Sequence, residues 1–112
     1  MKRRAPRLLA ACAIGAVALT VPVAASPPAG QTVTLRNIAF SPKSPTVARG
    51  TTVTFAWRDG DTAHNLVSKG TRRFKPIGIR ATGSQSRTFT KAGTYRYVCT
   101  LHPGMAGRIT VR

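Results

Sequence analysis

The feature that most restricts the fold of this chain is the alternation of apolar and polar residues in short runs rich in Thr, Val, Tyr and Phe. The runs are residues 31–36, 51–57, 87–90, 94–98 and 108–112. A period of two places successive side chains on opposite faces of a strand, so each run predicts a strand that is buried on one face. Gly and Pro residues separate the runs as turns, and no helical stripe of useful length is present.

This pattern predicts an all-β fold, namely a small antiparallel β-sandwich with Greek-key connections and about seven strands. Residues 31–112 are expected to form one domain. Within it, residues 69–85 are the least patterned stretch and predict a long basic crossover with room for one edge strand. A domain of this size buries a modest core, so a bound metal is one candidate for additional stabilisation.

The first quarter of the chain has a different character. Residues 1–7 are strongly cationic, residues 8–25 carry no charge, and small residues stand where a signal peptidase needs them. We therefore predict a secretory signal peptide over residues 1–25 and a short stiff linker over residues 26–30. An uncleaved membrane anchor is the alternative, because the uncharged run approaches a spanning length. The protein is expected to be exported, either to the periplasm or to the extracellular space, and to stay anchored if the segment is not cleaved.

The charge of the chain is strongly positive. Its 112 residues contain 18 Lys and Arg against two Asp and Glu, which gives a formal net charge of +16. Residues 26–112 keep 14 of those basic side chains and both acidic ones, a net charge of +12. Such a domain is steered toward acidic protein surfaces or anionic membrane faces. Nucleic acid is the generic alternative for a basic chain, but export and an aromatic content of only 6% disfavour it.

Residues able to bind a metal are concentrated near the C-terminus. Cys99, His102 and Met105 follow one another at steps of three, with one predicted strand leading in and another leading out. Pro103 and Gly104 make the loop tight, so the three side chains can point toward a common centre. Thiolate, imidazole and thioether together favour copper, especially Cu(I), over hard cations.

A fourth donor is expected from elsewhere in the domain, whose one other histidine is His64. His64 follows the predicted strand 51–57 and a turn, so it begins the next strand and can lie at the same end as the loop of Cys99. Two histidines, one cysteine and one methionine form the blue-copper set, a trigonal His₂Cys plane with a weak axial Met. Each residue alone has an ordinary structural explanation, such as a buried cysteine or a methionine that fills a gap in the core. Their conjunction favours a metal site.

In these residues the chain resembles the cupredoxin family, and within it the amicyanin-like and plastocyanin-like domains. The resemblance covers about residues 31–112, and its most specific part is the spacing Cys-x-x-His-x-x-Met, which amicyanin-like loops share. It implies that His64, Cys99 and His102 are the equatorial ligands of one copper ion and that Met105 is the axial ligand. It also implies that Asn65 ties the two ligand loops together and supports the surroundings of the cysteine sulfur.

The resemblance also implies a function, that of an exported type 1 blue copper protein that shuttles single electrons and is not itself an enzyme. In the family, electrons pass by the edge of the second histidine through an apolar patch, which residues 101 and 103–106 would supply here. Leu101 departs from the family pattern, in which a proline is common at this position, but its presence removes no ligand. The expected partner is a redox protein with an acidic docking surface, and the chain itself is expected to be a monomer.

Two other classes of function stay open at this point. The first is a copper-binding module for storage, delivery or resistance, in which redox cycling is incidental. The complete set of His64, Cys99, His102 and Met105 favours the carrier, because delivery proteins often rely on exposed Met and His clusters that this sequence lacks. The second is a metal-free interaction sandwich, which leaves the four donors unexplained.

Overall fold

The computed structural model of the chain describes residues 30–112. The predicted signal peptide, and the predicted linker up to residue 29, lie outside the described residues, so the division of the chain into leader, linker and domain stays a prediction. Residues 30–112 contain strands, turns and bends but no helix. Accordingly, this part of the chain has no helix that could span a membrane.

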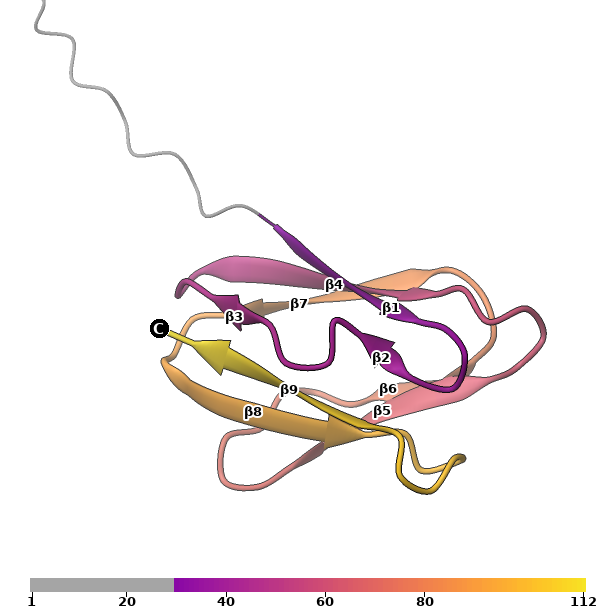
Figure 1. Ribbon diagram of the computed structural model, residues 1–112. Helices are drawn as coiled ribbons and strands as arrows, with labels where there is room; N and C mark the ends of the chain where they lie inside the picture. Colours follow the sequence, from indigo (N-terminus) through magenta and orange to yellow (C-terminus); the bar gives the residue numbers. More distant parts are fainter. Residues whose placement is uncertain (1–29) are drawn as a thin grey trace, which may run out of the picture.

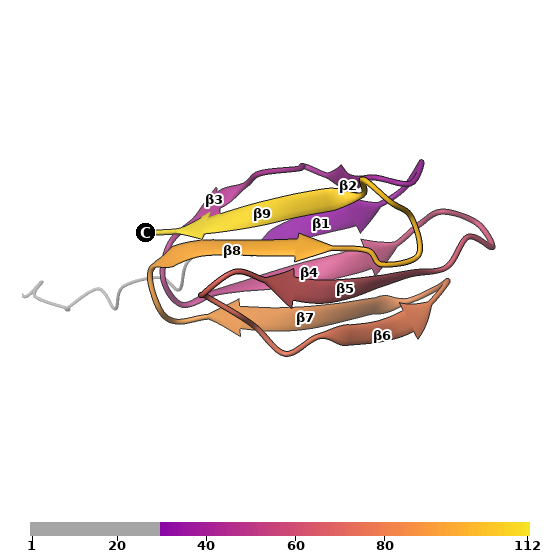
Figure 2. The same ribbon diagram turned by 90° about the horizontal axis from the view of Figure 1, so that it is seen from below.

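Within residues 30–112, nine strands form two sheets that face each other across the core (Figures 1 and 2). The first sheet has the order β2-β1-β4-β7 and the second has the order β3-β9-β8-β5-β6. The strands are β1 (Gln31–Leu35), β2 (Phe40–Ser41), β3 (Thr46–Val47), β4 (Thr51–Trp57), β5 (His64–Lys69), β6 (Ile77–Arg80), β7 (Ser84–Phe89), β8 (Gly93–Val98) and β9 (Ala106–Val111).

The predicted all-β sandwich is confirmed, but the predicted antiparallel pairing and the count of about seven strands are wrong in detail. Strand β1 pairs parallel with β4, and β3 pairs parallel with β9, so both sheets are mixed. The reason lies in residues 40–47, where the chain pairs for two residues in one sheet as β2 and then for two residues in the other as β3. Strands of two residues are too short to show alternation, so the sequence pattern did not reveal this change of sheet.

The least patterned segment was predicted to hold a crossover with one edge strand. Strand β6 is that edge strand, at the end of the second sheet beside β5. Strand β7 begins at Ser84, three residues earlier than the alternation indicated. Its first three residues are all polar and exposed, so only the pairing with β4 identifies them as a strand.

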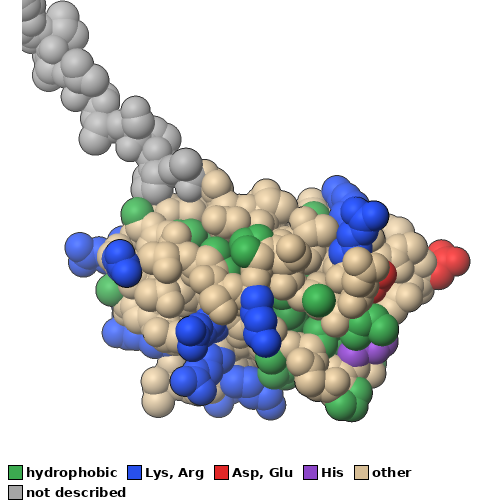
Figure 3. Space-filling model, in the orientation of Figure 1, with side chains coloured by type: hydrophobic (Ala, Val, Ile, Leu, Met, Phe, Trp, Pro, Cys, Tyr) green, Lys and Arg blue, Asp and Glu red, His purple; other side chains and the backbone are tan. Residues whose placement is uncertain are grey.

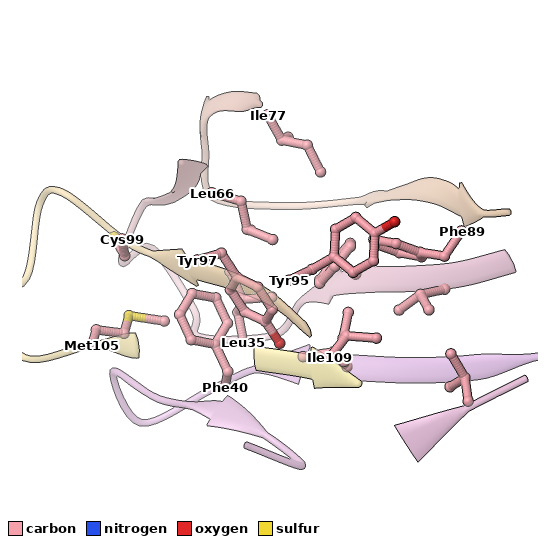
Figure 4. Packing of buried hydrophobic residues seen from close by; sticks show 14 of the residues in the cluster. Leu35, Phe40, Leu66, Ile77, Phe89, Tyr95, Tyr97, Cys99, Met105 and Ile109 are labelled. Carbon is pink, nitrogen blue, oxygen red and sulfur yellow. The ribbon is translucent and has the colours of Figure 1, made fainter. Parts of the chain in front are cut away.

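The core lies between the two sheets and is built from the inward residues of the alternating strands (Figure 4). Tyr97 of β8 is fully buried at its centre. Its ring meets Phe40 edge-on at 4.8 Å between ring centroids and Phe55 at 5.7 Å. Edge-to-face pairs of this kind add to the stabilisation that comes from buried apolar area. They hold β8 firmly, and β8 leads directly into Cys99.

The pairing of β5 with β8 decides where the candidate site lies. The two strands are antiparallel, with Val67 opposite Val98. The start of β5, which is His64, is therefore at the same end of the sandwich as the end of β8, which Cys99 follows. The topology alone brings together donors that are 35 positions apart in the sequence.

A close approach in the same sheet gives a prediction about stability. Gly107 of β9 lies opposite Tyr97, and a Cβ atom at Gly107 would stand 2.8 Å from the buried ring. Because that ring has no room to move, Gly107→Ala is expected to lower the free energy of unfolding by about 1–3 kcal/mol. The measurement is chemical denaturation, with Gly78→Ala as the control, because a Cβ at Gly78 meets nothing within 4 Å. Equal stability of the two variants would contradict the packing described here.

Candidate metal centre

Three of the four residues predicted to bind metal lie together at one end of the sandwich. One ligand atom each from His64, Cys99 and His102 can be chosen so that all three lie within 4.8 Å of one another. His64 and Cys99 are buried and His102 is half-buried. The sequence analysis expected His64, at the start of β5, to lie at the same end as Cys99, which follows β8, and the structure places them there.

Both the backbone and the ring of His64 are held in place. The indole Nε1 of Trp57 donates a hydrogen bond to the backbone oxygen of His64 at 2.9 Å. Within the ring, Nε2 lies 2.8 Å from Oδ2 of Asp59, and Nδ1 lies 3.8 Å from Sγ of Cys99. A carboxylate on Nε2 favours the tautomer whose proton is on that atom, which leaves the lone pair of Nδ1 facing the sulfur.

Asp59 is a functional residue that the sequence analysis missed. Its two carboxylate oxygens accept hydrogen bonds of 3.0 Å from the backbone N–H groups of Asn37 and Ile38, both of which have a φ of 54°. These bonds, first that of Ile38 and then that of His64, hold the pKa of Asp59 below its ordinary value of 3.8. A signal was present in the sequence, because one of its two acids stands five residues before His64.

The loop between β8 and β9 carries the other three predicted ligands. The backbone N–H of Cys99 donates to the oxygen of Met105 at 2.9 Å, and the N–H of Met105 donates to the oxygen of His102 at 3.0 Å. These bonds close the loop on itself. Met105 is only 4% exposed, and its sulfur lies at the same end of the core as Cys99 (Figure 4).

His102 is oriented by the residue that directly precedes β5. Its Nε2 lies 3.0 Å from the backbone oxygen of Ala63, an acceptor that requires the proton on Nε2 and leaves Nδ1 free. The centroids of the His102 and His64 rings are 4.8 Å apart. Both histidines therefore use Nε2 to bond the protein and keep Nδ1 available for a ligand.

Asn65 links the two segments that carry the donors, as the resemblance implied. Its amide Nδ2 donates to Oγ1 of Thr100 and its Oδ1 accepts from the backbone N–H of Thr100, both at 2.8 Å. Thr100 directly follows Cys99. The reciprocal pair therefore extends the β5–β8 ladder by side-chain bonds and fixes the position of the cysteine relative to His64.

The donor set fits copper chemically. A thiol that becomes a thiolate, two neutral imidazoles and a thioether are the soft and borderline ligands that copper prefers, whereas Ca²⁺ and Mg²⁺ require oxygen ligands. The only carboxylate near this cluster within the described residues, that of Asp59, is engaged by two backbone N–H groups and by His64. It is therefore placed to support a ligand and not to act as one.

Comparison with known proteins decides the family. A family model described as copper-binding proteins of the plastocyanin and azurin family matches residues 30–112. The chain belongs to this family. Copper is thus confirmed as its cofactor, and the predicted cupredoxin resemblance is confirmed with it. No curated protein sequence gives a significant match to the chain.

Solved structures include several similar folds. A purple cupredoxin from Nitrosopumilus maritimus is 23% identical over 73% of this chain and 99% of its own, with a TM-score of 0.66. An amicyanin mutant in its reduced state is 30% identical over 74% of this chain and 82% of its own, with a TM-score of 0.65. A copper-containing nitrite reductase from Thermus scotoductus is also 30% identical, with a TM-score of 0.64. This cupredoxin chain spans 25% of the length of that enzyme.

The contacts of Asp59 give a prediction that needs no metal. Asp59→Asn replaces one of the two acceptor oxygens by an amide group that donates. The remaining oxygen cannot accept all of the hydrogen bonds from residues 37, 38 and 64, so the metal-free variant is expected to unfold at a lower temperature than the original protein. Because the pKa of Asp59 is lowered in the folded protein, the carboxylate contributes its full stability above pH 3.8. This contribution is lost as the pH falls through the lowered pKa of the folded state. The difference between the two proteins, measured by thermal unfolding, should therefore be largest near neutral pH and shrink in acid.

The matched control is Asp61→Asn, which removes the same charge from the same loop. Asp61 is exposed and forms no ion pair with another described residue. Asp61→Asn should leave the unfolding temperature almost unchanged at every pH. A loss of stability as large as that of Asp59→Asn would show that the effect comes from net charge and not from the contacts with residues 37, 38 and 64.

Proposed function

We propose that this cupredoxin is an exported type 1 blue copper protein that carries single electrons between redox partners. In this proposal His64, Cys99 and His102 are the equatorial ligands and Met105 is the axial ligand. The observation that carries the proposal is the close grouping of the first three donors, all within 4.8 Å before any metal is considered. Copper bound there supplies a one-electron couple between Cu(II) and Cu(I).

The protein's contribution is to hold the donors still. Asp59 and Ala63 fix the two imidazoles, Asn65 fixes the segment after the cysteine, and the loop closes on itself. A site with fixed donors rearranges little when its charge changes by one electron, which favours fast transfer. The proposed role is therefore that of a carrier and not of an enzyme.

Burial supports a carrier over a copper storage or delivery module. His64 is fully buried and Cys99 is 3% exposed, so an acceptor protein has little direct access to two of the proposed ligands. A delivery protein has to hand over its ion, which exposed donors make easier. Here only His102 is half-buried, beside Leu101, which is 41% exposed. We infer that electrons enter or leave at this partly apolar end.

The structure does not alter the expected cellular location of the protein. The leader that predicts export lies outside the described residues, and the periplasm or the extracellular space remains the proposed location. The proposed partner is a redox protein with an acidic docking surface. The positive charge of the chain supports this choice, because opposite charges speed the encounter of two proteins.

The decisive experiment is to add Cu(II) to the purified protein and record the visible spectrum. A strong thiolate-to-copper band near ~600 nm is expected for the blue-copper donor set. Cys99→Ser should abolish the band, because the charge-transfer donor is removed, whereas Cys12→Ser in the full chain should keep it. A colourless protein, or a band that survives Cys99→Ser, would end the proposal.

A second test separates a carrier from a delivery module. The copper-loaded protein is cycled through oxidation and reduction in the presence of a Cu(I) chelator, and the bound copper is measured after each cycle. A carrier should retain its copper in both oxidation states and show a reversible one-electron wave in voltammetry. Rapid loss of Cu(I) to the chelator would favour delivery instead.

The proposed axial role of Met105 has its own test. Met105→Leu nearly conserves volume, so the fold should be kept. Copper should stay bound because the axial bond is weak, and the reduction potential should rise because Cu(II) loses more than Cu(I) when a fourth donor is removed. A rise of about 59 mV would correspond to a tenfold shift in relative affinity for the two oxidation states. Complete loss of copper would contradict the axial assignment.

A further inference from the structure

The outer face of the second sheet carries a row of positive charges with which no acidic side chain of residues 30–112 forms a salt bridge. In the register of this sheet Lys69 of β5 lies opposite Arg96 of β8, and Arg96 lies opposite Arg108 of β9. All three side chains are exposed. Neighbouring strands are about 4.8 Å apart, so the three charges stand close together, and like charges placed directly opposite each other destabilise a sheet.

A fourth cation extends the row. The backbone N–H of Arg108 donates to the oxygen of Lys43, which places the segment between β2 and β3 beside β9. Together the four cations line one groove of about 560 Å³ on the face of the sheet. We call this the cationic groove; its basic members are Lys43, Lys69, Arg96 and Arg108.

These cations are not neutralised within the described part of the protein. Among residues 30–112, the contact of Asp59 with His64 is the single close approach of an acidic side chain to a basic one. Several other arginines instead donate side-chain hydrogen bonds to backbone oxygens, namely Arg58, Arg73, Arg80 and Arg87. The four groove cations make no such bond to a described residue. Figure 3 shows several Lys and Arg side chains over the region of β8 and β9, while other cations lie elsewhere on this face, including near the end that bears the acidic and histidine side chains.

The groove also has an apolar border on the side of the metal centre. Val67, Val98 and Ala106 are neighbours in the register of the same three strands, two positions nearer the end that bears Cys99. All three are half-buried. Val98 lines the groove and is followed directly by Cys99, so a protein seated in the groove lies next to the strand that holds the proposed thiolate ligand.

We propose that the cationic groove is the docking surface for an acidic segment of the redox partner, whose carboxylates meet the row of cations. The identity of the partner as a redox protein rests on the proposed function, whereas the acidity of its docking segment rests on the groove. Binding relieves the repulsion between the registered cations and forms charge-assisted hydrogen bonds. The acidic segment sits beside β8, and the rest of the partner is then free to meet the apolar end at His102.

The shape of the groove favours a protein over other anions. A membrane surface is bound by apolar side chains that protrude into it, and the apolar border here is half-buried beside a concave surface. Single-stranded nucleic acid stacks its bases on exposed aromatic rings, and the aromatic residue of the groove, Tyr97, is fully buried.

The test uses the copper-loaded full chain and a fluorescein-labelled poly-glutamate peptide, with fluorescence anisotropy at low ionic strength. Arg96→Gln with Arg108→Gln is expected to weaken binding about tenfold, because two charge-assisted contacts are lost. The matched control is Arg49→Gln with Arg112→Gln, which removes the same charge from two exposed residues outside the groove. The control pair should change the affinity less than about twofold, by screened long-range attraction alone.

A second pair of variants guards against loss of structure. Lys43→Gln with Lys69→Gln removes the two outer cations and should also weaken binding of the peptide. The thermal midpoint of both groove pairs should be no lower than that of the original protein, since each pair removes like-charge repulsion. If either groove pair bound the peptide as well as the control pair does, the groove would not be the docking surface.

Other outcomes are equally decisive. Equal weakening by groove and control pairs would mean that net charge alone binds the peptide, which would overturn the proposal. Binding of anionic phosphatidylglycerol vesicles through the groove, without binding of the peptide, would identify a membrane surface instead and would also overturn it. The visible band of the copper-loaded protein is recorded in parallel. Its absence would contradict the carrier function, whereas failure of peptide binding with the band intact would contradict only the groove.

Discussion

The candidate site depends on the antiparallel pairing of β5 with β8. This ladder brings the start of one strand beside the end of the other, and the reciprocal bonds of Asn65 with Thr100 continue it past the last backbone pair. A shift of register by one residue would turn His64 away from the cysteine, because side chains on a strand alternate between its two faces. The buried aromatic cluster around Tyr97 opposes such a shift, so the packing of the core and the geometry of the site are parts of one constraint.

A second layer of contacts determines how the donors face the centre. Each imidazole gives its Nε2 to an oxygen of the protein, His64 to a carboxylate and His102 to a backbone carbonyl. The two partners differ in charge, and a carboxylate makes an imidazole a stronger donor than a carbonyl does. The two imidazoles therefore differ in their strength as electron donors to a metal, although both offer Nδ1. The inequality originates in residues 37 and 38, whose left-handed backbone turns two N–H groups toward Asp59.

Much of this could be predicted from the sequence, and the omissions have physical causes. Period-two alternation predicted the sandwich and five of its strands, and the chemistry of Cys99, His102 and Met105 predicted a soft-metal loop. The two-residue strands and the parallel pairs were missed, because their partners are chosen by tertiary contacts and not by local pattern. Asp59 was missed for a related reason. Its role depends on the backbone of residues 37 and 38, and a left-handed Asn-Ile pair has no clear signature in sequence.

The loop from Cys99 to Met105 holds three of the proposed donors in seven residues and is fastened by its own backbone bonds. Most of the metal-binding chemistry is thus carried by a single hairpin, whereas the sandwich supplies one histidine and the supports around it. Such an arrangement is modular. Insertion or deletion within the hairpin can alter the electronic properties of the centre while the scaffold stays as it is, so redox behaviour can diversify among descendants without a new fold.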